Sequence, residues 1–166
     1  MPEDRWKPSV TVAAIIEREG RYLLVEERTS QGLQLNNPAG HLEPGESLAE
    51  AVAREALEET ACPFVPQALV GIYLARLVHA RTGEDIHYLR FAFCGAVGEP
   101  EPGRVLDEPV VRTLWLTLEE VRGSAARHRS PLVLQCIEEH AAGRRFSMDT
   151  LVTHESVRRL GPLLHK

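Results

Sequence analysis

The chain has little cysteine and no long apolar run, and both absences narrow what it can be. Its three cysteines, Cys62, Cys94 and Cys136, are well separated and lack the close pairs of zinc sites and redox motifs. We therefore expect reduced thiols with a structural role. The longest apolar run, residues 10–16, is too short to span a bilayer, and the start of the chain is polar. We expect a cytoplasmic protein without a membrane partner.

Strong positive charge is also absent. The formal net charge is -5 at pH 7, and no basic run gives the footprint of a protein that binds a nucleic acid polymer. A phosphorylated small molecule would therefore need bound divalent cations and a few placed arginines as local partners.

The composition is that of a globular protein. Hydrophobic residues make up 43% and charged residues 26%, and 166 residues suffice for a sizeable core. No linker or repeat divides the chain, so we predict a single domain over residues 1–166, with residues 1–8 as an N-terminal tail. The predicted assembly is a monomer or a homodimer.

Apolar segments and turn signals outline a mixed α/β fold. Residues 9–17 and 21–26 are predicted strands, joined as a hairpin at Glu19-Gly20, and residues 31–37 are predicted to form a loop. Further strands are expected at residues 68–78, 86–97 and 111–116, the first two of them central, and residues 99–107 form a surface loop. Helices are expected from Ser47 onward, near residues 118–121 and over residues 131–142.

The most informative stretch is residues 40–62, in which one glycine, one arginine and four glutamates stand at fixed intervals: Gly40, Glu46, Arg54, Glu55, Glu58 and Glu59. At about 100° per residue, the last three glutamates lie within an arc of about 100°, so their carboxylates share one helix face.

Residues around that face support the helix. Ser47 and Glu50 form a capping-box pattern, and Pro44-Gly45 before them is typical of a type II turn, which gives Gly45 and Glu46 a structural role. Arg54 lies four residues from both Glu50 and Glu58, so it is placed to bridge neighbouring carboxylates.

Carboxylates without Cys or His favour Mg²⁺, with Mn²⁺ as a substitute. Such an ion polarises phosphoryl oxygens and lowers the pKa of a bound water, which can then attack phosphorus. An isolated Glu58-Glu59 pair would more simply be a solvated helix face. The six specified positions together favour a metal site over that explanation.

These six positions resemble the Nudix box, in which a glycine, a glutamate and an Arg-Glu-x-x-Glu-Glu core recur at this spacing. The resemblance implies an α/β fold, namely an α/β/α sandwich around a mixed β-sheet, and hydrolysis of a nucleoside diphosphate linked to another group. It also implies that Glu55, Glu58 and Glu59 bind the metal, with the Gly40 carbonyl as a further ligand.

Two residues depart from the family pattern without removing a ligand. Ala61 stands where a glycine usually ends the helix, and Ala56 replaces a bulky aliphatic residue. An alanine in the left-handed conformation costs on the order of 1 kcal/mol, so we expect mild strain or a shifted helix end.

Outside the box, residues 36–43, 89–91 and 129–133 are similar to the NudJ-type branch of Nudix phosphatases. That branch implies removal of phosphate from nucleoside di- and triphosphates and action on thiamine-related pyrophosphates such as hydroxymethylpyrimidine pyrophosphate.

Four residues beyond the box are further candidates. Glu108, beside Asp107, stands where many Nudix enzymes place an acidic residue that reaches the metals or serves as base; a solvated loop charge is the alternative, and Glu55 and Glu58 are also candidate bases. Arg90 is predicted to bind phosphate, the alternative being a salt bridge to a box glutamate. His41 is a candidate substrate contact, and Ser130 either caps a helix or shapes the substrate site.

Three functions are weighed. The leading one is a Mg²⁺-dependent phosphohydrolase in which an activated water attacks the terminal phosphorus of a nucleotide or a pyrimidine pyrophosphate. The second is a Nudix pyrophosphatase that cuts between the α and β phosphates of ADP-ribose or a dinucleotide. The third is a non-catalytic Nudix module that senses nucleotides, and the complete carboxylate set speaks against it.

Overall fold

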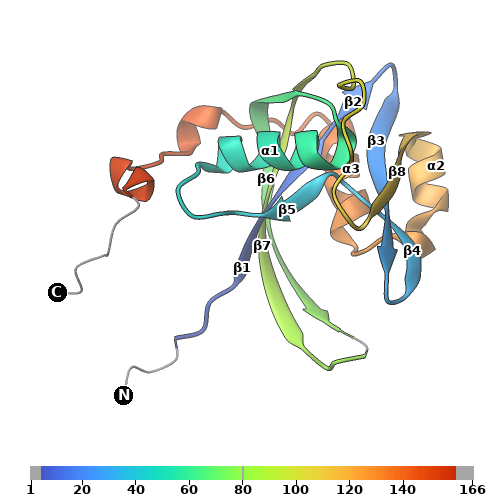
Figure 1. Cartoon of the computed structure of the whole chain (residues 1–166), viewed down its shortest axis with the longest axis horizontal. Coiled ribbons are helices and arrows are strands. Elements are labelled where there is room, and N and C mark those ends of the chain that lie inside the picture. The colour runs from blue at the N-terminus through green and yellow to red at the C-terminus, as the bar shows by residue number, and fades with distance from the viewer. Residues whose placement is uncertain (1–4, 80, 160–166) are drawn as a thin grey trace.

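Two sheets form the centre of the computed structural model, which describes residues 5–79 and 81–159 (Figure 1). The first sheet has the order β5 (Ala39–His41), β1 (Ser9–Ile15), β7 (Asp85–Val97) and β6 (Phe64–Val78). Since β1 runs parallel to β7 whereas β5 and β6 run antiparallel to their neighbours, this sheet is mixed.

The second sheet is built around β3 (Arg21–Thr29). It pairs antiparallel with β2 (Glu17–Arg18), β4 (Gly32–Asn36) and β8 (Val110–Thr117). The pairing with β8 joins segments almost a hundred residues apart, because Leu23 lies opposite Trp115.

Helices cover the first sheet on two faces. These are α1 (Leu48–Thr60) and α3 (Leu132–Ala141), with the shorter α2 (Leu118–Gly123) beside α3. Successive side chains of β1 point to opposite faces, so Val12 and Ala14 belong to the apolar cluster under α1, whereas Ala13 and Ile15 belong to the cluster under α3. The α/β/α sandwich implied by the sequence is therefore the observed fold. Three short 3₁₀ turns follow α2 and α3, at Ala125–Arg127, Met148–Thr150 and Glu155–Arg158.

The predicted ends of α1 are confirmed. The Ser47 hydroxyl accepts a hydrogen bond from the Glu50 N–H, and the Glu50 carboxylate accepts one from the Ser47 N–H, which completes the capping box. Gly45 has a φ of 91°, as the third position of a type II turn requires. At the other end Ala61 adopts the left-handed conformation with a φ of 60°, so the missing glycine has left mild strain rather than a shifted end.

Three predictions about strands were wrong, because backbone pairing between strands, and not the polarity of a segment or its order in the chain, decides its place in a sheet. Residues 31–37, predicted as a loop, contain β4, a largely polar strand held by its pairing with β3. The predicted opening hairpin is limited to β2 and β3, since β1 joins the other sheet. Of the two strands predicted to be central, β7 is, but β6 lies at the sheet edge.

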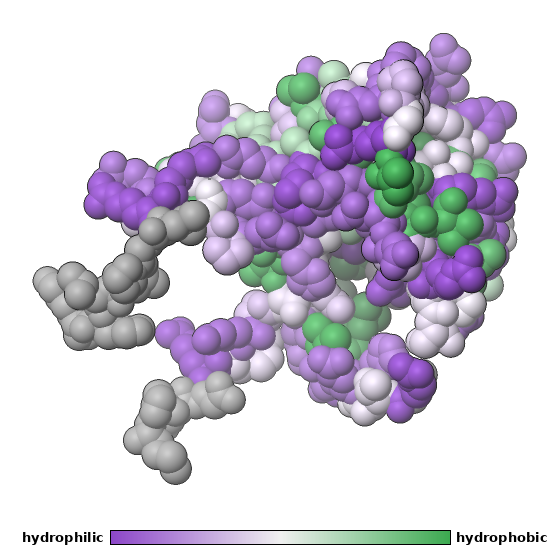
Figure 2. All heavy atoms as spheres, in the orientation of Figure 1, coloured by the Kyte–Doolittle hydropathy of each residue, from purple (hydrophilic) through white to green (hydrophobic). Residues whose placement is uncertain are grey.

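The surface agrees with the composition. In Figure 2 polar residues cover most of the visible face, and apolar residues appear as separate smaller groups. Across the described ranges, no helix is both long enough and apolar enough to cross a membrane.

Cys62, Cys94 and Cys136 are free and buried, as expected for structural thiols. Residues 5–8 of the predicted tail have no helix or strand, and residues 1–4 lie outside the described part.

Candidate active site

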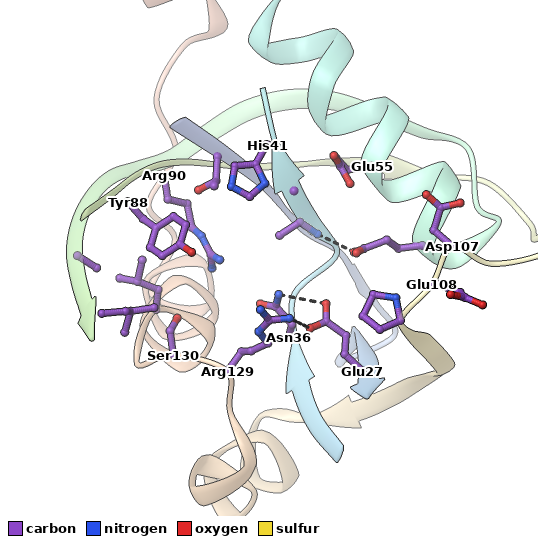
Figure 3. Close-up of a pocket in the computed structure, with 18 of the residues that line it drawn as sticks. Glu27, Asn36, His41, Glu55, Tyr88, Arg90, Asp107, Glu108, Arg129 and Ser130 are labelled. Atoms are coloured by element: carbon purple, nitrogen blue, oxygen red, sulfur yellow. Dashed lines mark hydrogen bonds and ion pairs between the residues drawn. The ribbon is translucent and has the colours of Figure 1, made fainter. Parts of the chain in front are cut away.

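A cavity of about 370 Å³ lies where α1, β5, β7 and the start of α3 meet (Figure 3). Its wall combines acidic side chains at one end with Tyr88, Arg90 and Ser130 at the other, and Asn36, Arg129 and Glu27 lie between them. The acidic side chains that line it are Glu27, Glu43, Glu55, Glu59, Asp107 and Glu108.

Arg54 ties the glutamates of the motif together. Its guanidinium donates to both carboxylate oxygens of Glu46 at 3.0 and 2.8 Å, to Glu55 at 2.7 Å and to Glu58 at 3.1 Å. It also donates to the His41 carbonyl at 3.0 Å, which fixes the helix against β5. The predicted bridge to Glu58 is confirmed, whereas Glu50 pairs instead with Arg158, at 2.8 Å.

Gly40 is the point of closest approach between β5 and α1. A Cβ atom built on Gly40 would lie 2.1 Å from the carboxyl carbon of Glu55, a distance that no real contact shows. A side chain at this position would therefore displace the Glu55 carboxylate, which lies directly against the backbone of β5. Burial raises the pKa of the Glu55 carboxyl, and the Arg54 guanidinium opposes that rise.

Glu59 is the most buried carboxylate of the motif, with 8% of its surface exposed. It accepts a hydrogen bond from the Ala39 N–H at 2.9 Å. Burial raises its pKa to about 8. The hydrogen bond from Ala39 opposes that rise, and the nearby charges of Glu27, Glu55 and Asp107 add to it. A bound cation is the natural compensation for this excess of buried negative charge.

Glu58 is placed differently from the other two box glutamates. Its side chain does not line the cavity, keeps 31% of its surface exposed and pairs with Arg54. Its backbone carbonyl accepts a hydrogen bond from the Asp107 N–H at 3.0 Å, which holds the loop of Asp107 and Glu108 beside the end of α1. Glu108, predicted from its position in the sequence, thus lies at the cavity, and its neighbour Asp107 lies there too.

Arg90 stands at the opposite end. It is buried, and no salt bridge joins it to a box glutamate anywhere in the described ranges, so that alternative explanation is not supported. His41 also lines the cavity, with its ring centroid 6.3 Å from that of Tyr88. Ser130 is not the predicted helix cap: the cap position of α3 falls on Pro131, and the Ser130 hydroxyl has no hydrogen-bond partner among the described residues.

Sequence reasoning missed Glu27 and Thr11, which both line the cavity. Glu27 is buried, accepts a hydrogen bond from Arg129 at 2.6 Å and lies 3.4 Å from the Asn36 amide nitrogen. The sequence carried a signal for Glu27, because Glu26 and Glu27 directly follow the apolar residues of β3, in the buried part of that strand. Thr11 gives no such signal, because only the strand register brings it to the cavity.

The donor set suits a hard divalent cation, because every acidic group at this end offers oxygen, and burial disfavours the ionised forms of Glu55 and Glu59, a cost that a cation would offset. In the described part of the chain, however, no three His, Cys, Asp or Glu side chains form a ready metal cluster. In this arrangement Arg54 holds Glu55 and Glu58 in ion pairs. The ligand set remains a prediction.

Comparisons with known proteins agree with this geometry. A family model described as the NUDIX domain matches residues 5–136. The chain belongs to the Nudix family. Phosphatase NudJ of Escherichia coli K12 is 34% identical over 146 residues, which cover 88% of this chain and 92% of that protein. The resemblance of the Nudix motif and of the flanking segments is thereby confirmed, and the chain is a Nudix hydrolase.

Solved Nudix structures share the fold. A NUDIX hydrolase from Nitrosomonas europaea is 49% identical, with a TM-score of 0.82, and the match covers 90% of this chain and 99% of that one. A MutT protein from Methanosarcina mazei Go1 is 26% identical, with a TM-score of 0.63 over 82% of this chain and 96% of the other.

Proposed function

We propose that this Nudix hydrolase is a Mg²⁺-dependent phosphohydrolase that releases phosphate from nucleoside di- and triphosphates or from pyrimidine pyrophosphates such as hydroxymethylpyrimidine pyrophosphate. The observation that carries the proposal is a cavity with buried carboxylates at one end and a buried guanidinium, Arg90, at the other. A phosphorylated small molecule that brings divalent cations matches both ends.

The carboxylate end would hold the metal. Glu55, Glu58, Glu59 and the Gly40 carbonyl are the proposed ligands of Mg²⁺, which would supply positive charge to the phosphoryl oxygens and a more acidic bound water. Arg54 keeps the carboxylates in place through the ion pairs described above. It acts through the glutamates and is a positioning residue.

The other end would hold the substrate. Arg90 lies buried, two of its nitrogens have no hydrogen-bond partner in the part of the chain that the structure describes, and a phosphate is the group that would neutralise it best. His41, with its side chain exposed at the rim, is a proposed second contact. Glu108, at the acidic end, is a proposed base for the attacking water, alongside Glu55 and Glu58.

The size of the cavity favours a small substrate. A volume of about 370 Å³ is near the lower end for ligand sites, which suits a mononucleotide or a pyrimidine pyrophosphate better than ADP-ribose or a dinucleotide. The relative named phosphatase NudJ favours removal of a terminal phosphate in the same way. We propose cytoplasmic action on such metabolites, by a single domain.

A substrate panel with Mg²⁺ and with Mn²⁺, run in ¹⁸O-labelled water, tests the proposal. Labelled orthophosphate is the expected product. Release of a nucleoside monophosphate from ADP-ribose or a dinucleotide would instead identify a pyrophosphatase. Nucleotide binding without any turnover would support the sensor and contradict the proposal.

A further inference from the structure

The buried polar atoms that lack a partner are concentrated in one place. Across the described residues, these side-chain atoms are Thr11 Oγ1, Asn36 Oδ1, Asn37 Oδ1, Arg90 Nε and Nη1, and Ser130 Oγ. All of them except the Asn37 atom belong to residues that line the cavity. Native proteins pair nearly all buried polar groups, so such a concentration marks a surface that is completed by something other than the protein.

Strand pairing and a loop contact bring these residues together. Thr11 and Arg90 are register partners on the parallel strands β1 and β7, so their side chains are neighbours on the same face of the sheet. The Arg129 N–H donates to the Leu35 carbonyl at 2.9 Å, which fixes Ser130 next to the end of β4, where Asn36 lies. In Figure 3, Ser130 lies on the same side of the cavity as Arg90, and Asn36 lies between that side and the acidic end.

The orientation of Asn36 gives this end its chemistry. The Asn36 amide nitrogen points toward Glu27, which can only accept, and Glu27 is itself held by Arg129 at 2.6 Å. The Asn36 Oδ1 atom is therefore a fixed acceptor. A phosphate offers acceptors and would be repelled by it, so this position requires a ligand group that donates a hydrogen bond.

We propose that Thr11, Asn36 and Ser130 form a specificity subsite beside Arg90 that binds a hydroxyl- or amino-bearing group of the substrate, next to its phosphates. The inference rests on the proposed function and deepens it. In this arrangement Arg90 binds the last phosphate of the substrate. The Asn36 Oδ1 acceptor then lies where the substrate presents a hydrogen-bond donor in place of a phosphate. The two hydroxyls adapt to either role, because each can donate or accept.

Calorimetric titration tests the subsite without turnover. Protein in EDTA is titrated with inorganic pyrophosphate and with the four common ribonucleoside diphosphates. At least one nucleotide should bind tenfold more tightly than pyrophosphate. Ser130→Ala should lower that nucleotide's affinity about tenfold and leave pyrophosphate affinity unchanged, because an unpaired buried group on the ligand costs this much. Asn36→Leu should do the same.

Analogues locate the donor on the ligand. If CDP binds more tightly than UDP, the hydrogen-bond donor is the ring amino group. If CDP binds more tightly than 2′-deoxy-CDP, the donor is the sugar hydroxyl. Ser124→Ala is the matched control: Ser124 Oγ donates to the Val121 carbonyl, and Ser124 does not line the cavity, so the ratio of affinities should not change.

Two results would overturn the subsite: equal binding of pyrophosphate and every nucleotide, or an equal loss for both ligand types on Ser130→Ala. Failure of the proposed function is seen separately. In that case the wild-type protein with Mg²⁺ releases no orthophosphate, although the preference for a nucleotide and its loss in Ser130→Ala are still measured.

Discussion

The two ends of the cavity are built in opposite ways. The motif residues of the carboxylate end come from one continuous segment, with Gly40 in β5 and Glu55 and Glu59 in α1, and the loop before β8 adds Asp107 and Glu108. The hydrogen-bonding end is assembled from β1, β4, β7 and the loop before α3. A metal-binding motif can thus be encoded locally, whereas the surface that selects the substrate depends on the whole sheet.

The two ends also differ in charge. At the carboxylate end burial and like charges raise the pKa of Glu55 and Glu59, which marks a surplus of negative charge. At the other end burial lowers the pKa of Arg90, although the charge of Glu27 opposes that fall, and two of its buried nitrogens, Nε and Nη1, have no hydrogen-bond partner in the described structure. Each end is unfavourable alone, and a cation together with a phosphorylated ligand would relieve both.

Replacement of a carboxylate should have the largest effect. Glu55→Gln keeps the shape of the side chain and removes the charge, and Glu58→Gln does the same for the glutamate paired with Arg54. We expect turnover to fall about a thousandfold in each, equivalent to about 4 kcal/mol of transition-state stabilisation. Steady-state kinetics measures this, and circular dichroism checks the fold.

The exposed Glu101→Gln is the matched control, because Glu101 pairs with Arg104 outside the cavity. Its activity should equal that of the wild type. Full activity of Glu55→Gln would remove that residue from the proposed ligand set and weaken the contrast between the two ends.

Loss of the buried guanidinium should come next. Arg90→Met keeps the length of the side chain and should raise KM for phosphorylated substrates about 10- to 100-fold, since a charge-assisted contact is lost. It should also stabilise the fold, because a buried charge without a partner is replaced by an apolar side chain. Kinetics and thermal unfolding measure the two effects.

Arg76→Met serves as control, since Arg76 is exposed and pairs with Asp85. It should change neither KM nor stability by much. An unchanged KM in a folded Arg90→Met protein would argue against phosphate binding at this end of the cavity.

The pKa of Glu59 makes stability depend on pH. This pKa is raised from 4.5 to about 8 in the folded protein. Between these two pH values, the Glu59 carboxyl is protonated in the folded state and ionised in the unfolded state. The contribution of Glu59 to the stability of the metal-free protein is therefore complete below about pH 4.5 and lost as pH rises through about 8. Glu59→Gln cannot ionise and should not lose this stability. At about pH 9 its free energy of unfolding should exceed that of the wild type by on the order of a few kcal/mol.

Urea unfolding in EDTA at about pH 6 and about pH 9 measures the difference. Added Mg²⁺ should stabilise the wild type more than the variant, because the proposed ligand is ionised only in the wild type. A variant whose advantage does not grow with pH would show that Glu59 titrates normally.

The smallest effect is expected at the end of the motif helix. Ala61→Gly relieves the left-handed backbone at φ 60° and should stabilise the protein by about 1 kcal/mol or less. Thermal unfolding should show a rise of a few degrees at most. Ala49→Gly, inside α1, should have the opposite sign, since glycine weakens a helix interior. A destabilised Ala61→Gly would mean that the helix end depends on the alanine side chain.

Predictions from the sequence succeeded where local rules decide the structure. The capping box of α1, the turn at Gly45 and the left-handed Ala61 follow from neighbours within a few residues. They failed where distant segments compete for a partner. Arg158, far along the chain, takes Glu50 away from Arg54, and β1 leaves the predicted hairpin to pair with the distant β7.

By itself, the sequence determined the fold class, the family and the helix that carries the carboxylates, because hydrophobic period, capping and motif spacing all act over short distances. Tertiary structure alone decided that Glu55 and Glu59 line the cavity whereas Glu58 does not, and that Thr11, Asn36, Arg90 and Ser130 meet with unpaired polar atoms. Strand register and burial set those positions, and both depend on contacts between residues far apart in the chain.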